Sequence, residues 1–85
     1  MPDVEMEVAR DLEAWALTRT ANAMNGLCRR YAALAKDSEE SARSAAIGGY
    51  HRAEHEHRCE AAAYRQAASM AGAEEAALLR RARDL

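Results

Sequence analysis

The chain has 85 residues and a mass of 9.3 kDa, which is enough for one small domain and too little for two. Its hydrophobic share is 49%, but 22 of those residues are alanine, and valine, isoleucine, leucine and phenylalanine together number only 10. Such a composition approaches that of disordered chains, yet the net charge of −2 lacks the excess that completes the disorder signature. We therefore expect one folded domain, residues 1–85, with a small core of its own.

Composition also excludes several classes of protein. No apolar run approaches the roughly 18 residues that a membrane span requires, and the N-terminus lacks the basic start and apolar stretch of a signal peptide. The two cysteines are far apart in the sequence, which favours free thiols and a cytoplasmic location over a disulfide-linked secreted scaffold. With 12 basic against 14 acidic residues, nucleic acid is not the expected partner.

The residue types predict an all-α fold. Alanine, glutamate, arginine, leucine and methionine, which favour helices, dominate the chain, whereas β-branched residues are scarce. The one proline, Pro2, lies at the N-terminal end, where it cannot interrupt a helix.

Residues 3–16 predict an N-terminal helical arm. Asp3 is suited to be its N-cap. The large apolar residues recur at helical spacing and form one stripe, which consists of Val4, Val8, Leu12 and Trp15. Because aromatic anchors are enriched where partners dock, we interpret this stripe as a partner-binding surface. The alternative is that the arm folds back onto its own bundle or onto a second subunit.

The first helix of a hairpin is expected over residues 17–36. Its apolar face lies roughly 150° from the stripe of the arm on a continuous helical wheel. Two explanations are open for this shift. Either the helix breaks at residues 17–20, with Thr18 or Thr20 as an N-cap, or it runs unbroken and offers different faces to two partners.

A turn near residues 37–38 is expected to lead into the second hairpin helix, residues 38–71. Gly48-Gly49 is a competing turn signal, but the apolar positions keep one helical phase across it, so we interpret the helix as continuous. That register sets Gly49 opposite Gly26. A weaker break at residues 71–73 would separate a short C-terminal helix, residues 73–84.

The apolar face of the second hairpin helix is roughly twice as wide as one neighbouring helix needs. This predicts a second neighbour, most simply another copy of the chain, and hence a homo-oligomeric bundle of four or more helices. The expected oligomer interface comprises Tyr50, His57, Ala61, Tyr64 and Ala68.

The segment 50–60 holds the densest set of potential metal ligands. His51 and His55 are four residues apart, a spacing at which two imidazoles can hold zinc or another transition metal on one helix face. Glu54 and His57 form the Glu-x-x-His spacing of di-iron bundles, although the expected register lacks a carboxylate to complete such a site. The alternative to metal binding is that His51 and His55 are surface histidines and that His57 is a satisfied buried or interfacial histidine.

Two further groups of side chains carry weaker signals. Cys28 and Cys59 are the only thiols, and each is interpreted as a small buried apolar side chain rather than a nucleophile. Arginines at positions 29, 30, 80, 81 and 83 could contact phosphates, but we interpret them instead as solvated side chains or as complements to the C-terminal helix dipole.

The sequence as a whole favours a small non-enzymatic binding or regulatory protein that acts on a macromolecular partner through a homo-oligomeric helical bundle. No catalytic residue and no required cofactor is expected. A metal-binding bundle that uses the histidine and glutamate cluster and a nucleic-acid-binding dimer are the alternatives.

Overall fold

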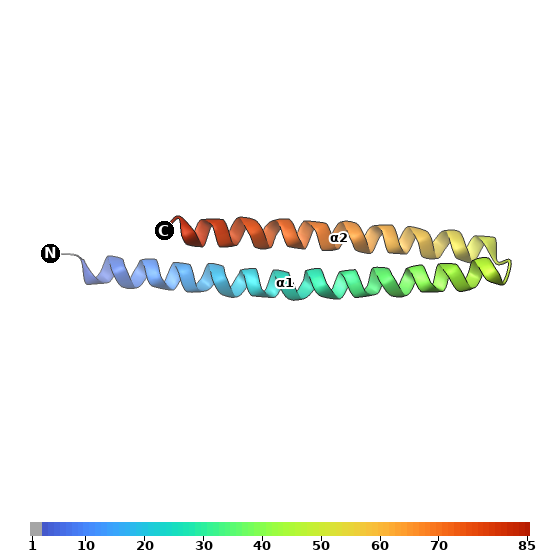
Figure 1. Ribbon diagram of the computed structural model, residues 1–85. Coiled ribbons are helices and arrows are strands. Elements are labelled where there is room, and N and C mark those ends of the chain that lie inside the picture. Colours follow the sequence, from blue (N-terminus) through green and yellow to red (C-terminus); the bar gives the residue numbers. More distant parts are fainter. Residues whose placement is uncertain (1–2) are drawn as a thin grey trace.

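The computed structural model describes residues 3–85, and these form two long α-helices that lie side by side (Figure 1). Helix α1 is Val4–Ile47 and helix α2 is His51–Arg83. They run antiparallel and form a rod with Cα extents of 73 × 13 × 12 Å. The expectation of an all-α hairpin is confirmed.

Buried and half-buried positions follow a seven-residue repeat along each helix. Steps of three and four alternate, as in helices whose side chains interlock along a shared seam. In α1 the positions that follow this repeat are 14, 17, 21, 24, 28, 31, 35, 38, 42 and 45, and in α2 they are 54, 57, 61, 64, 68, 71, 75, 78 and 82. The other half-buried positions, which are 25, 34, 39, 46, 53, 67, 72 and 77, lie beside the seam. The two helices therefore contact each other along one straight seam.

Small side chains fill most of this seam. The most compact apolar cluster is Leu17, Ala21 and Leu78, with Met24 and Ala82 packed against it. Tyr31 and Tyr64 stack across the seam with their ring centroids 6.3 Å apart. The other buried residues are alanines and Ser38. Alanine allows a close approach of the helices but contributes little buried apolar area, so the hairpin holds few large buried contacts.

The chain reverses at Gly48-Gly49, where α1 ends in a Schellman motif. The Tyr50 amide donates to the Ala45 carbonyl at 2.8 Å, and the Gly49 amide donates to the Ala46 carbonyl at 3.1 Å. Gly49 has a φ of +77°, a left-handed conformation in which a Cβ is unfavourable. The Tyr50 ring lies over Gly48, because a Cβ added there would be 2.7 Å from the ring.

The expected turn at residues 37–38 is therefore wrong, and so is the pairing of Gly26 with Gly49. Ser38 instead lies within α1 and is buried in the seam, at 6% exposure. Gly26 lies within α1, and a Cβ added to it would meet nothing within 4 Å. The helix continues to Gly48-Gly49 because these are the first residues that satisfy the terminal carbonyls and supply a positive φ.

The helices also run unbroken through residues 17–20, where a break was one of two explanations, and through residues 71–73, where a weaker break was expected. The hydroxyl groups of Thr18 and Thr20 donate to carbonyls four residues earlier, at 2.8 and 2.9 Å, so they bond within α1 instead of capping a new helix. Of the two explanations for the change of face, the structure has the unbroken helix. Gly72 also lies within α2, so residues 73–84 are not a separate helix.

The N-terminal arm is the part of α1 that extends past the end of α2 (Figure 1). Helix α1 has 44 residues and α2 has 33, and both meet at the same turn. At about 1.5 Å per residue, the difference leaves roughly three turns of α1 without a neighbouring helix. The arm continues straight along the rod, so it does not fold back onto its own hairpin.

Substitution of Gly49 by alanine should destabilise the hairpin, because a residue with a Cβ costs about 1–2 kcal/mol in the left-handed conformation. Urea unfolding at a fixed protein concentration measures this change in the free energy of unfolding. Gly26→Ala is the matched control: its added methyl group meets open space within a helix, so it should stabilise the protein by up to about 1 kcal/mol. Equal effects at both positions would contradict the assigned turn.

Candidate functional site

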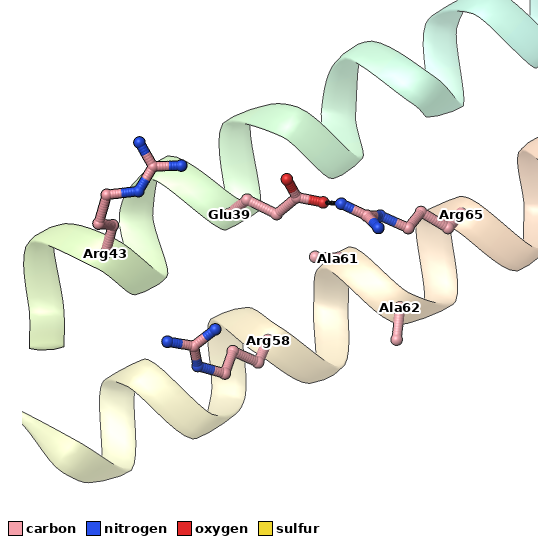
Figure 2. Close-up of a pocket in the computed structure, with 6 residues that line it drawn as sticks. All are labelled: Glu39, Arg43, Arg58, Ala61, Ala62 and Arg65. Carbon is pink, nitrogen blue, oxygen red and sulfur yellow. Dashed lines mark ion pairs between the residues drawn. The ribbon is translucent and has the colours of Figure 1, made fainter.

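A basic face runs along one side of the seam. Three shallow grooves open on this side, and residues of both helices line each of them. Figure 2 shows the groove around Glu39, which has a volume of about 420 Å³. We define the basic face by the cationic residues that line these grooves, which are Lys36, Arg43, Arg58, Arg65, Arg80 and Arg83. The only acidic residue among the lining residues of these three grooves is Glu39.

The seven-residue repeat places the three grooves on the same side of the rod. Thr18, Ala32 and Glu39 of α1 are separated by multiples of seven residues, so they occupy equivalent positions beside the seam. On α2 the same relation joins Arg58, Arg65 and Leu79. The grooves are thus segments of one continuous surface.

Two of the arginines on the basic face are paired with carboxylates. Arg65 forms an ion pair with Glu39 across the seam (Figure 2). The Nε and Nη2 atoms of Arg58 donate to one carboxylate oxygen of Glu54, at 2.9 and 2.7 Å. The remaining members of the face take part in no ion pair within residues 3–85. Lys36 and Arg43 therefore keep their positive charge free beside the groove.

An apolar face lies on the opposite side of the seam. We define it as Leu27, Leu34, Ala63, Ala67 and Met70, which by the seven-residue repeat flank the seam away from the grooves. No helix of this chain covers it, and Leu27 and Met70 are 38% and 66% exposed. The antiparallel register sets these five residues at one level of the rod, so they form a single patch.

The predicted partner-binding stripe lies on the arm and is exposed. The exposed fractions of Val4, Val8, Leu12 and Trp15 lie between 53% and 68%. The guanidinium of Arg19 lies 5.2 Å from the centroid of the Trp15 ring, within the range of a cation–π contact. The four apolar side chains therefore remain available to a partner.

The residues expected at the oligomer interface lie mainly in the seam of the same chain. Ala61 is buried, Tyr64 stacks on Tyr31, and His57 and Ala68 are half-buried at seam positions. Tyr50 lies at the turn and is exposed. The wide face of the second helix was assigned to another subunit because α1 was placed in the wrong register.

The proposed metal ligands are engaged in local contacts. His51 Nδ1 is 3.9 Å from a Glu54 carboxylate oxygen, His57 Nδ1 is 3.3 Å from one of Glu60, and His55 Nε2 is 3.6 Å from Cys59 Sγ. These are contacts between residues one turn apart on α2. Within residues 3–85, no group of three or more histidine, cysteine, aspartate or glutamate side chains is arranged to hold a metal ion.

The two cysteines lie in different surroundings. Cys28 is half-buried, and its sulfur would lie 3.7 Å from a Cβ added to Gly72, so this thiol fills the space left by the glycine. Cys59 is exposed on α2, which differs from the expected burial. Over residues 3–85, neither helix contains an apolar stretch long enough to cross a membrane.

Comparison with known proteins identifies no relative: no family model, no curated protein and no solved structure matches the chain. The function of the chain is therefore inferred from its basic face, its apolar face and the apolar stripe of its arm. The sequence reasoning found the apolar stripe of the arm but missed the basic face. The seven-residue spacing of Lys36 with Arg43 and of Arg58 with Arg65 reveals that face once the turn is placed at Gly48-Gly49.

Trp15→Ala should change the free energy of unfolding by no more than about 0.5 kcal/mol, because the side chain is 62% exposed and packs against no second helix. Leu78→Ala, which truncates a side chain of the core cluster, should cost about 2 kcal/mol or more. Urea unfolding followed by circular dichroism compares the two variants. A large loss for Trp15→Ala would show that the arm is part of a core.

Proposed function

We propose that this protein is a non-enzymatic binding module whose hairpins associate through their apolar faces into a four-helix bundle. One observation carries the proposal: the hairpin leaves Leu27 and Met70 exposed and Leu34 only half-buried, although its own seam is filled mainly by alanine. A chain with so few large buried side chains gains stability by covering a further apolar surface. A second copy is the simplest partner, since a two-fold axis sets the same patch against itself.

The length of the rod supports this assembly. Specific stable interfaces bury about 1,200–2,000 Å² in total, so the contact has to extend beyond the apolar face along the rods, which are 73 Å long. The alanines of the apolar face allow close contact between subunits, while Leu27 and Met70 supply larger exposed side chains at the end of this face away from the turn. The basic face points away from this interface.

The arm provides a contact surface for a protein partner. Its stripe of Val4, Val8, Leu12 and Trp15 has the spacing of an amphipathic helix that fits into an apolar groove. Large aromatic side chains such as Trp15 contribute much of the affinity in such contacts. The module then acts by occupying a partner, in the cytoplasm, with no chemical step of its own.

Light scattering at micromolar concentration should give at least twice the chain mass of 9.3 kDa. The double variant Leu27→Glu with Met70→Glu should reduce the measured mass to that of one chain, because it places four carboxylates in a two-fold interface. The matched control is Ala33→Glu with Ala73→Glu, which adds the same charge at exposed positions away from both faces and should leave the mass unchanged.

Circular dichroism of the same samples separates dissociation from unfolding. A wild-type protein that stays monomeric and helical would refute the assembly. The partner-binding role of the arm has its own test, since Trp15→Ala should abolish capture of the partner protein while helicity and mass stay the same. Loss of mass in that variant would show that the arm contacts a second subunit instead.

A further inference from the structure

We propose that the basic face binds the phosphate backbone of a nucleic acid. This inference goes beyond the protein-binding arm, because it concerns a different surface and a different class of ligand. The formal net charge of −2 gives no hint of it. The observation that carries it is the separation of charge across the rod.

The two sides of the seam carry opposite charge. The six cationic residues of the basic face share their grooves with one carboxylate, that of Glu39. Arg29, seven residues before Lys36, extends the same row. By the same repeat, the side of the basic face also carries Asp11, on the arm, whereas the side of the apolar face carries two arginines, at positions 30 and 81, and six acidic residues, at positions 13, 37, 56, 60, 74 and 84. The near-neutral total is thus the sum of a positive and a negative surface.

The cations form a regular row. Arg29, Lys36 and Arg43 lie on α1 at intervals of two helical turns, which is about 10.5 Å. With the turn at residues 48–49, Arg65 and Arg58 of α2 fall between them along the rod. The five side chains therefore alternate between the helices in steps of about 5 Å. A straight row of this kind can contact successive phosphates of a strand, which present a dense and regular line of negative charge.

The chemistry of the face favours phosphate over an acidic protein segment. The central row consists of Arg29 and four residues of the basic face, which are Lys36, Arg43, Arg58 and Arg65. All of them except Lys36 are arginines, and the planar guanidinium group of arginine can donate two parallel hydrogen bonds to phosphate oxygens. Between the cations the grooves are lined by small residues, which are Ala32, Ala35, Ala61, Ala62 and Ala68. An interface with a protein would be expected to centre on a large apolar or aromatic anchor, and the central grooves hold none.

Glu39 lies within the groove and limits its affinity for anions. Its carboxylate neutralises Arg65, as Glu54 neutralises Arg58, whereas Lys36 and Arg43 on either side of Glu39 along α1 have no ion pair among the described residues. Lys36 and Arg43 are therefore the residues that contribute most to phosphate binding. Removal of the Glu39 charge would free Arg65 to join them.

Fluorescence anisotropy of the full-length protein with a labelled duplex of about 20 base pairs, made as DNA and as RNA, tests the proposal. Binding should be detectable at about 50 mM salt and weaken steeply by about 200 mM. Lys36→Gln with Arg43→Gln should raise the Kd about tenfold and reduce the slope of log K against log salt concentration by about two. A labelled single strand of the same sequence shows whether duplex geometry is required.

The control Arg19→Gln with Arg52→Gln removes the same charge from residues outside the basic face, and it should change the Kd by less than about twofold. Glu39→Gln should tighten binding several-fold, whereas Glu40→Gln, which removes a neighbouring charge from the outer side of α1, should have a smaller effect. Circular dichroism verifies that each variant is folded.

Three results would overturn the proposal. The first is no binding at low salt, and the second is an equal loss of affinity in the Lys36/Arg43 double variant and in the control double variant. The third is displacement of the labelled duplex by polyglutamate as readily as by unlabelled duplex. The last result would indicate an acidic protein as the ligand. Mass measurements of the same variants keep this test separate from the proposed assembly. A dimer that binds no duplex rejects this inference alone, and a monomer that binds it rejects the assembly alone.

Discussion

The close contact of α1 with α2 along a seam of small side chains is the constraint on which the other features of this protein depend. Alanine brings the helices together without bulky side chains between them, so the hairpin is narrow and straight. The same choice of residue leaves little buried apolar area within one chain. Larger side chains are found at the end of the seam away from the turn, in the Tyr31–Tyr64 stack, and on surfaces that the hairpin itself does not cover.

A two-helix rod with one seam has two long sides, and here they differ in chemistry. The grooved side carries arginines and a lysine, whereas the other side carries leucine, methionine, alanine and most of the neighbouring carboxylates. Neither property is visible in the total composition, because the charges cancel when they are summed. The position of the seam decides which residues share a side, and the position of the turn decides the seam. Gly49 with its positive φ therefore has consequences for every surface of the molecule.

The sequence predicted the helical class, the hairpin and the apolar stripe of the arm, because these depend on residue type and on local spacing. It did not predict the turn. Alanine occurs on every side of both helices, so apolar periodicity hardly distinguishes the seam from the surface. Ile47 and Tyr50 are among the apolar positions that keep one helical phase across Gly48-Gly49, which favoured a continuous helix. In the structure they flank the turn and are 85% and 69% exposed. The error in register then moved seam residues such as Ala61 and Tyr64 into a subunit interface and obscured the basic face.

The unequal lengths of the two helices make α1 a spacer as well as a structural element. Trp15 and Arg43 lie on one unbroken helix, 28 residues apart, so at 1.5 Å per residue they are held about 42 Å apart at a fixed relative angle. Ligands on the arm and on the basic face would thus be presented at a set distance and orientation. Residues 4–13 have no seam to maintain, so a single residue inserted just before Ala14 would rotate Val4, Val8 and Leu12 by about 100° relative to Trp15 and leave the hairpin unchanged. Evolution could re-aim the arm in this way without rebuilding the rest of the protein.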